Sequence, residues 1–435
     1  MGQNRRLNWR TIPIRDLYLG MFDGVHGTPK PAKGGPIFLG IRNLMDDGHF
    51  DLTDIRHIQE EDFPRWTKRV EPQAGDIVFS YEATLNLYGI IPDGFRGCLG
   101  RRLALIRPNP EKVDTRFLFY YFFGSEWRAT IQKNILEGAT VQRIPISGFP
   151  EFPVTIPPLE SQRRIASILS AYDDLIENNT RRIKILEEMA KLIYREWFVE
   201  FKAPGVKLRK ATAEEKKTTG KDVFPEGWEL RRYSDEIESF QGGDWGGEEA
   251  TEGEGSPVII IRGTDFEDIR WGNQLRTPRR FISETSMQKR RLRKGDIIVE
   301  NSVNAKSRCV GTSLYIAEGI VRRLSDDFVA ASFCKVFRFK QPTLAPLFLM
   351  HMKDLYVTNR MNFYQNVAAN GIGNFQATRF IETESVPMPV DSTKLNGLAD
   401  FFSGLTESTL SDTNYNLRQT RDLLLPKLVN GEVEV

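Results

Sequence analysis

Polar side chains follow the same Gly-Asp-Ile tripeptide in the two halves of the chain. The first loop, residues 81–88, supplies Glu82, Thr84 and Asn86. The matching loop further along supplies Asn301, Ser302, Asn304, Lys306 and Arg308. Side chains of these types donate and accept hydrogen bonds at base edges in the grooves of DNA. The loops are therefore candidates for base contacts, the alternative for any one residue being an ordinary hydrogen-bonded loop.

A second pair of polar segments lies downstream of these loops. The first half supplies Thr140, Gln142 and Arg143, and the second supplies Asn374, Gln376, Thr378 and Arg379. The register between the two segments is ambiguous in the sequence. As a matched set in both halves, they extend the candidate base-reading surface.

Basic residues gather in one stretch of the second half. The run comprises Arg279, Arg280, Lys289, Arg290, Arg291, Arg293 and Lys294, against the single acid Glu284. We expect this run to contact phosphates, with an affinity that falls steeply with salt. Lys30 and Lys33 are a weaker counterpart in the first half. The acidic run at 248–254 should avoid the DNA backbone or face a basic partner.

Catalytic and metal-binding patterns are missing from the sequence. The four histidines stand apart, and the three cysteines are too scattered for a metal knuckle or a disulfide framework. The sequence has no phosphate-binding loop with its lysine and hydroxyl, and no Asn/Asp-Pro-Pro-aromatic motif of amino-methyltransferases. We therefore expect a chain that is not an enzyme and that holds no metal or cofactor.

These candidate residues lie on a domain that occurs twice. Ile41-Arg42 recurs as Ile261-Arg262, and the tripeptide at Gly75 recurs at Gly295, both at an offset of 220 (295 − 75). The offset grows to 230 at Leu118 and Phe348, so about ten residues enter the second copy within roughly 301–342. A shared scaffold with diverging loops is expected of a binding protein whose two halves recognise different targets.

A long helix is predicted between the two copies. Its apolar seam follows steps of four and three for more than four heptads, the spacing of a helix packed along its length on another. The seam residues are Ile165, Leu169, Tyr172, Ile176, Asn179, Ile183, Leu186, Ala190, Ile193 and Trp197. Asn179 either fixes the register against the partner helix or is a tolerated polar residue near a bend.

A second, weaker helical seam closes the chain. It comprises Leu398, Phe402 and Leu405, then slips by one to Leu410, Leu417, Leu424 and Leu428. Pro426 is expected to distort the last turn. Residues 204–224, rich in Lys, Glu, Thr and Gly, read as an exposed linker between the first helix and the second copy.

Composition agrees with a folded chain in the cytoplasm. Of the 435 residues, 40% are hydrophobic and 27% charged, and the formal net charge is +2. The most apolar run, Phe117–Phe123, is far shorter than the ~20 residues of a membrane span. The N-terminus is polar and has no apolar signal region behind it. We expect a cytoplasmic protein without a membrane partner.

Three short motifs and the long helix together carry a family resemblance. They are Pro157-Pro158-Leu159-Glu160-Ser161-Gln162, the long helix after it, Phe224-Pro225-Glu226-Gly227-Trp228, and Leu424-Leu425-Pro426-Lys427-Leu428. Their order and spacing resemble the specificity subunit of type I restriction–modification systems over essentially the whole chain. The last helix, whose seam slips near Thr409, departs from a regular member.

The resemblance implies an α+β fold in which two globular α/β target-recognition domains stand in tandem repeat, separated and joined by two long antiparallel coiled-coil helices. The expected ranges are 1–156 for recognition domain one, 157–203 for spacer helix one, 204–224 for the linker, 225–390 for recognition domain two and 391–435 for spacer helix two. Below, residues 1–156 are called the first copy and residues 225–390 the second copy.

The resemblance also implies partners. Each recognition domain would read one half of a bipartite, asymmetric site in double-stranded DNA. The helices would act as a spacer and dock two methyltransferase subunits, which recruit the restriction (motor–nuclease) subunits. S-adenosylmethionine, ATP and Mg would belong to those partners. The alternatives are a coiled-coil adaptor with protein-binding globular domains and the specificity arm of another methylation-based defence system.

Overall fold

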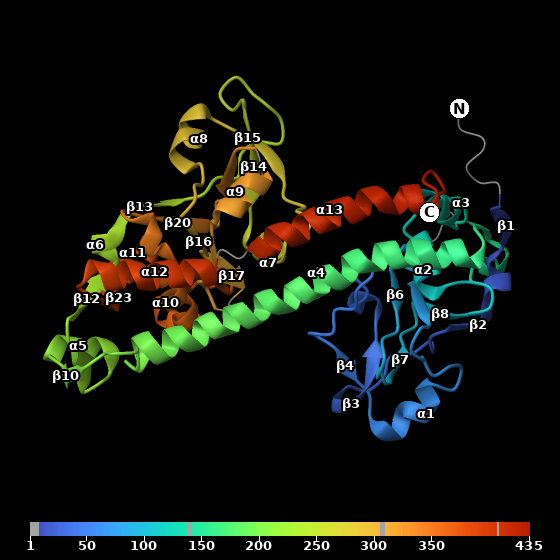
Figure 1. The fold of residues 1–435 in the computed structure, drawn as a ribbon, viewed down its shortest axis with the longest axis horizontal. Helices are drawn as coiled ribbons and strands as arrows, with labels where there is room; N and C mark the ends of the chain where they lie inside the picture. The colour runs from blue at the N-terminus through green and yellow to red at the C-terminus, as the bar shows by residue number, and fades with distance from the viewer. Residues whose placement is uncertain (1–7, 137–140, 305–308, 325, 407–408) are drawn as a thin grey trace. The chain divides into compact units, whose positions relative to one another are not determined.

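The computed structural model describes residues 8–136, 141–304, 309–324, 326–406 and 409–435. The chain divides into two compact units, which are described one at a time below. Unit 1 comprises Met1–Asp174 with Gln419–Val435, and unit 2 comprises Leu175–Arg418. Two helices contribute to both units, α4 (Leu159–Tyr194) and α13 (Thr409–Val429) (Figure 1).

Unit 1 contains the first copy. Its strands are β1 Arg10–Pro13, β2 Tyr18–Asp23, β3 Ala32–Leu39, β4 Arg56–His57, β5 Ile77–Ser80, β6 Tyr88–Ile90, β7 Gly97–Leu99, β8 Leu103–Pro108 and β9 Pro153–Ile156. Its helices are α1 Phe63–Trp66, α2 Thr115–Tyr121 and α3 Ser125–Lys133, with 3-10 turns η1 Ile14–Leu17, η2 Ile41–Asn43, η3 Glu60–Asp62 and η4 Phe149–Glu151. The strands form an antiparallel sheet in the order β2-β8-β5-β6, a mixed sheet β4-β3-β7 and the pair β1-β9.

Unit 2 contains the second copy. Its strands are β10 Leu208–Lys210, β11 Val223–Pro225, β12 Trp228–Arg232, β13 Ile237–Gly242, β14 Ser256–Ile261, β15 Arg279–Ile282, β16 Ile297–Glu300, β17 Ser302–Asn304, β18 Ser313–Tyr315, β19 Phe328–Ala330, β20 Cys334–Phe339, β21 Gln365–Val367, β22 Ile372–Phe375 and β23 Ser385–Pro389. Its helices are α5 Ala213–Thr219, α6 Tyr233–Glu236, α7 Phe266–Trp271, α8 Glu284–Arg290, α9 Glu318–Leu324, α10 Ala345–Val357, α11 Ala377–Thr383 and α12 Ser392–Thr406, with 3-10 turns η6 Gly263–Asp265, η7 Pro342–Leu344 and η8 Arg360–Tyr364.

The two copies share one sheet topology. The order β13-β20-β16-β18 in unit 2 repeats β2-β8-β5-β6 of unit 1, and β15-β14-β19 repeats β4-β3-β7. In both three-stranded sheets the central strand pairs in parallel with the last, β3 with β7 and β14 with β19. The pair β12-β23 likewise repeats β1-β9. The predicted α+β tandem repeat is confirmed.

A buried ionic clamp holds the central strand of the first copy. The Asp76 carboxylate receives two hydrogen bonds from the Arg107 guanidinium, at 2.8 Å each, and a third from the backbone N–H of Gln73. The Asp76 side chain is 2% exposed. This carboxylate raises the pKa of Arg107. Gly75, with φ +87°, makes the turn that places Asp76, a backbone conformation that favours glycine.

The second copy repeats this clamp bond for bond. Asp296, 1% exposed, receives two hydrogen bonds from Arg338 at 2.8 and 2.7 Å and one from the backbone N–H of Arg293. Gly295 has φ +91°. The ionic partners are 31 residues apart in the first copy and 42 in the second. The extra length includes helix α9, so the insertion predicted within 301–342 is confirmed.

Helix α4 begins where its sequence motif predicts. The side-chain amide of Gln162 donates to the carbonyl of Pro157, and its oxygen accepts from the backbone N–H of Asp114. Asp114 in turn caps α2 through the N–H of Phe117. The 36 residues of α4 extend about 54 Å at 1.5 Å per residue and continue into a π-helical turn, Arg195–Val199.

Polar anchors join α4 and α13 within each unit. In unit 1, Asp173 of α4 accepts hydrogen bonds from Arg421 of α13 and from Tyr120 of α2, both at 2.5 Å. In unit 2, the fully buried Asn414 of α13 donates to the carbonyl of Ile176 and the hydroxyl of Thr180. The Asn414 amide nitrogen is thereby hydrogen-bonded, whereas its buried side-chain oxygen has no hydrogen-bond partner among the described residues.

Two expected segments differ in detail from their predictions. The expected single last helix is described as α12 and α13, on either side of residues 407–408, and Pro426 lies inside α13. The expected linker 204–224 carries ordered elements, the strands β10 and β11 and the helix α5. Composition missed them because α5 is held by polar contacts: Thr212 and Glu215 form a capping box, and Glu215 pairs with Arg209.

Breaking the clamp should destabilise the copy that contains it. Arg338→Met leaves the Asp296 carboxylate buried without its cation, which we expect to lower the free energy of unfolding by about 3–5 kcal/mol. Urea denaturation would measure the loss. Arg291→Met is the matched control, because Arg291 pairs with Asp327 at side-chain exposures of 60% and 36%. Its loss should stay below about 1 kcal/mol. Equal losses in the two variants would contradict a special role for the clamp.

Candidate nucleic-acid interface

The structure brings the two candidate segments of the first copy together. Glu82 and Arg143 form an antiparallel bridge. The backbone N–H of Ala83 donates to the carbonyl of Gln142 at 2.8 Å. Loop 81–88 and the segment around Arg143 are therefore one surface. Thr84, Gln142 and Arg143 are exposed on it, whereas Glu82 is half-buried. Thr140 lies outside the described residues.

Loop 81–88 has a fixed and unusual backbone. Ala83 and Asn86 have φ values of +72° and +62°, a region that L-residues rarely adopt and that marks strained or functional loops. Asn86 is held because its side-chain oxygen accepts a hydrogen bond from the hydroxyl of Tyr88. Burial raises the pKa of Tyr88, which also accepts from the indole N–H of Trp127. Asn86 therefore has a structural role in addition to its candidate one.

The same juxtaposition occurs in the second copy. Strand β17 pairs with β22, placing Ser302 opposite Asn374, and the Ser302 hydroxyl donates to the Asn374 side-chain oxygen at 2.9 Å. The backbone N–H of Phe375 donates to the carbonyl of Asn301. Since Ser302 corresponds to Glu82 at the offset of 220, Asn374 corresponds to Arg143. The register that is ambiguous in the sequence is thereby fixed.

A surface hollow in the second copy gathers several candidates. It is lined by Phe240, Asn301, Lys335, Phe375, Gln376, Ala377, Thr378, Arg379 and Glu382. The Arg379 guanidinium lies 4.0 Å from the ring centroid of Phe363 and donates to the Gln376 side-chain oxygen at 3.2 Å. Phe363 is 61% exposed. Arginine stacks on aromatic faces and recognises phosphate or guanine through its planar fork, so Arg379 remains a candidate for such a contact.

The predicted basic run is largely paired with acids. Arg279 contacts Asp326, Arg280 contacts Glu248, Arg291 contacts Asp327 and Lys294 contacts Glu318, at 2.8, 3.0, 2.7 and 3.9 Å. Arg290 donates to the Ser286 hydroxyl and to the carbonyl of Gly242. Much of the positive charge that the sequence suggests for phosphate contact is therefore balanced within this copy. Within the acidic run, Glu248 contacts Arg280, which is one of the two outcomes expected from the sequence.

Other candidates for phosphate contact lie at the surface. Among the described residues, Lys289 and Arg293 are exposed and form no ion pair, and Lys30 and Lys33 are exposed on the first copy. Asn304 is exposed at the end of β17. Lys306 and Arg308 lie outside the described residues.

Sequence reasoning missed three residues of this surface. They are Phe363, Lys335 and Asn366, of which Asn366 lies opposite Asn374 in the register of β21 with β22. Asn366 carries the same carboxamide as the candidates beside it. The sequence signal was only its spacing within a polar hairpin, which specifies neither register nor exposure.

The predicted helix seams lie inward. On α4, Ile165, Leu169, Ile176, Asn179 and Ile183 are buried, and Tyr172, Leu186 and Ile193 are half-buried. Near the C-terminus Phe402 is buried, and Leu398, Leu405, Leu417 and Leu424 are half-buried. The sequence did not single out a second stripe on α4, where Ile185, Met189 and Leu192 are 58%, 45% and 64% exposed.

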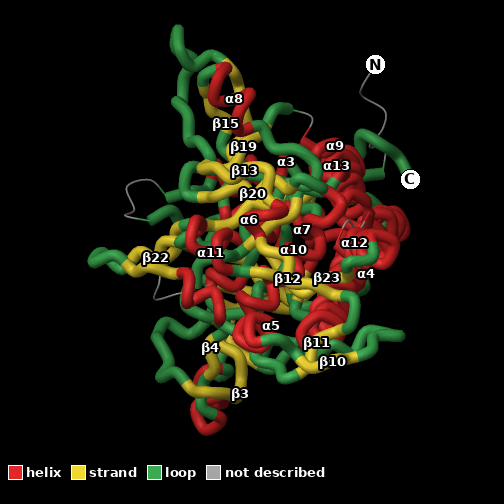
Figure 2. The backbone as a smooth tube through the Cα atoms, turned by 90° about the vertical axis from the view of Figure 1, so that its left-hand side faces the viewer, coloured by secondary structure: helices red, strands yellow, loops and turns green. Residues whose placement is uncertain are grey.

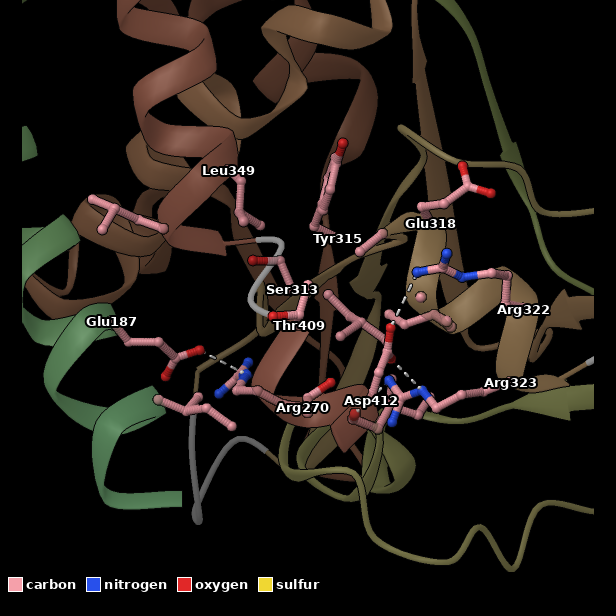
Figure 3. A pocket seen from close by; sticks show the side chains of 18 of the residues that line it. Glu187, Arg270, Ser313, Tyr315, Glu318, Arg322, Arg323, Leu349, Thr409 and Asp412 are labelled. Atoms are coloured by element: carbon pink, nitrogen blue, oxygen red, sulfur yellow. Dashed lines mark hydrogen bonds and ion pairs between the residues drawn. The ribbon is translucent and has the colours of Figure 1, made fainter. Parts of the chain in front are cut away.

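A charged cavity of about 160 Å³ lies where α4 and α13 meet the second copy within unit 2 (Figure 3). Glu187 of α4 contacts Arg270 of α7 at 3.2 Å, and Asp412 of α13 contacts Arg323 of α9 at 3.0 Å. Burial lowers the pKa of Lys353, which also faces Glu187, to about 8. These ion pairs link α4 to α7 and α13 to α9, so they hold the two helices against the second copy.

The described residues contain no group of three or more His, Cys, Asp or Glu side chains arranged to hold a metal ion. None of their helices combines the length and the apolar character that crossing a bilayer requires.

Comparison with known proteins agrees with the sequence motifs. Residues 33–188 match the family model of the type I restriction modification DNA specificity domain. The MjaIX specificity subunit of Methanocaldococcus jannaschii is 27% identical over 180 residues, which cover 41% of this chain and 39% of the relative. The MjaVIII subunit of that organism is 23% identical over 259 residues, covering 60% and 56%. The HindI subunit of Haemophilus influenzae is 25% identical, covering 38% and 36%. Each match spans less than two thirds of the relative's own length.

One solved structure resembles the whole fold. The S subunit of a type I restriction–modification system from M. genitalium aligns over 98% of both chains with a TM-score of 0.53, at 16% identity. At this identity the likeness concerns the fold alone. The specificity-domain match over residues 33–188 and the related specificity subunits show that this part of the chain is similar to type I restriction–modification specificity subunits.

Proposed function

We propose that this chain is a non-catalytic DNA-recognition subunit whose two copies each read one half of a bipartite, asymmetric site. The observation that carries this proposal is one scaffold present twice with different side chains at equivalent positions. Glu82 and Arg143 pair in the first copy where Ser302 and Asn374 pair in the second. Equivalent supports that present different hydrogen-bonding groups suit two different target sequences.

The proposed partners supply the chemistry. Two methyltransferase subunits would dock on the helices, and restriction subunits would join through them, bringing S-adenosylmethionine, ATP and Mg. The exposed stripe of Ile185, Met189 and Leu192 on α4 supports docking on a helix, because its spacing of four and three is that of a helix–helix contact. The functional ranges 1–156, 157–203, 204–224, 225–390 and 391–435 belong to the same proposal.

The helices would also set the distance between the half-sites. Half-sites on one face of B-DNA lie about 34–36 Å apart per helical turn. The long α4, with its polar anchors to α13 in each unit, is suited to a spacer of fixed length. The number of unread base pairs would then follow from helix length.

Two other functions make different predictions. A coiled-coil adaptor with protein-binding domains would give no sequence preference when purified with a methyltransferase. The specificity arm of another methylation-based defence system would lack neighbouring genes for a separate methyltransferase and a motor–nuclease. The different polar pairs on one scaffold favour the DNA-reading function over the adaptor.

Deleting the gene should remove one methylated motif from the source genome. We expect loss of adenine methylation at a single bipartite, asymmetric sequence, with other motifs unchanged, because specificity resides in this chain. Methylation-sensitive sequencing of the strain with and without the gene measures this. A methylome that keeps every motif would contradict the proposal.

Lengthening both helices should lengthen the unread spacer. One heptad inserted between Asp174 and Leu175 in α4, and another between Arg418 and Gln419 in α13, adds about 10.5 Å. At 3.4 Å per base pair we expect up to about three more unread pairs, with both half-sites unchanged. The same heptad inserted after Gly253, in a loop, is the control and should leave the motif as it was. If the variant with both insertions kept the same number of unread base pairs, the proposed role of the helices would be contradicted.

The stacked arginine of the second copy should be sensitive to conservative replacement. Arg379→Lys keeps the charge but loses the planar, stacked fork. We expect the affinity of the assembled complex for its site to fall, by about 1–3 kcal/mol if Arg379 reads a guanine. Arg291→Lys, which alters an exposed ion pair, should change the affinity little. Fluorescence anisotropy with a labelled duplex measures both, and equal effects would argue against a specific contact by Arg379.

A further inference from the structure

The second copy contains a small sheet whose register aligns three polar side chains. Strands β17, β22 and β21 pair in that order. Ser302 lies opposite Asn374, and Asn374 lies opposite Asn366. These three residues form one row across the strands, here called the amide row. Figure 2 shows the end of this sheet at β22 extending outward from the body of unit 2.

The two faces of this sheet have opposite characters. Side chains alternate along a strand, so Val303 and Phe375 point to the face opposite the amide row. Val303 and Phe375 are both 5% exposed and belong to the core of the second copy. Asn366 is exposed, and Ser302 and Asn374 are half-buried. The core therefore fixes one face and leaves the amide row on the other.

The segment that carries Asn366 and Asn374 contains no charged residue. Residues 361–378 contain no Asp, Glu, Lys, Arg or His, and the segment is flanked by Arg360 and Arg379. No carboxylate of this segment would repel a DNA backbone. Arg360 pairs with Glu384 at 3.4 Å, whereas Arg379 stacks on Phe363 at the other end of the segment. Amide groups next to such a cation suit contact with base edges beside a phosphate.

Hydrogen bonds within the sheet orient the row. Ser302 donates to the Asn374 side-chain oxygen, which leaves the Asn374 amide nitrogen to donate outward. Gln365, on the other face, accepts from the backbone N–H of Val310 and thereby ties β21 to the preceding loop. Asn370 closes the hairpin turn by accepting from the N–H of Ile372. Other polar residues of the hairpin thus hold the backbone that presents Asn366.

Resting on the proposed function, we infer that the amide row is the surface on which the second copy reads an adenine-containing base pair in the major groove. A side-chain carboxamide matches the N6 donor and N7 acceptor of adenine. Asn366 forms this bidentate contact, and the Asn374 amide donates to the neighbouring acceptor. Strands β21 and β22, which carry Asn366 and Asn374, form a two-stranded antiparallel ribbon, and a major groove admits a ribbon of this kind.

The corresponding row of the first copy has a different chemistry. Glu82 and Arg143 take the places of Ser302 and Asn374, and the backbone N–H of Leu136 donates to the carbonyl of Arg143. This row has no carboxamide. The exposed Arg143 suits a guanine at the equivalent position, whereas Glu82 is half-buried and faces Arg102 at 3.5 Å.

The test uses the full chain assembled with its methyltransferase subunits. Competition binding against duplexes carrying each single base-pair change in the bipartite site gives a discrimination profile. For Asn366→Ala we expect discrimination at one A·T pair of the second copy's half-site to fall roughly 5- to 150-fold. The profile of the other half-site should stay unchanged. Asn362→Ala, an exposed carboxamide outside the row, is the matched control and should leave both profiles intact.

Each outcome decides the inference. A profile unchanged in both Asn366→Ala and Asn374→Ala overturns it, as does a uniform loss of affinity on all duplexes without loss of discrimination. If Asn374→Ala lowers the thermal midpoint because Ser302 loses its acceptor, the exposed Asn366→Ala still decides the matter. A wild-type complex without any bipartite preference would instead sink the proposed function, so the two failures are distinguishable.

Discussion

A buried carboxylate paired with an arginine fixes the strand on which each copy is organised. Asp76 and Asp296 are almost completely removed from solvent, and each accepts two guanidinium hydrogen bonds and one from the backbone. A charge in that position persists only when it is paired and fully hydrogen-bonded. The strand that follows, β5 or β16, lies centrally in its sheet and leads directly into the polar loop. The clamp thus sets where the variable residues begin.

The two copies share their buried residues and differ in their surface residues, because the two kinds of position are constrained differently. The clamp, the sheet order and the parallel pairing of β3 with β7 and β14 with β19 recur because they are buried and coupled to their neighbours. The residues at the bridge between the polar loop and its neighbouring segment are not coupled to the core in this way. Glu82 and Arg143 form an isolated bridge in the first copy, and Ser302 and Asn374 occupy the equivalent places in the ladder of β17 with β22 in the second. The proposed reading of two different half-sites would require such a separation.

Electrostatic pairing decides which polar residues are available to a ligand. The run at 279–294 has the composition of a phosphate-binding segment, yet Arg279, Arg280 and Arg291 face Asp326, Glu248 and Asp327. Asp326 and Asp327 are distant in sequence, and Glu248 belongs to the acidic run at 248–254. Composition therefore could not reveal these pairs. Arg379 is oriented by stacking on Phe363, a contact between residues on η8 and α11. The exposed cations of the site are accordingly fewer than a count of basic residues suggests.

The sequence by itself determined the duplication, the long helix with its buried seam, and the segments that carry the candidate contacts. These follow from local periodicity and from matching residues at a fixed offset, which need no knowledge of three-dimensional neighbours. Only the tertiary structure decided that loop 81–88 meets Arg143, that Asn374 is the counterpart of Arg143, and that Asn366 joins Ser302 and Asn374 in one row. The physical reason is that strand register depends on hydrogen bonds between distant segments, and a slip of one residue would turn every side chain to the opposite face.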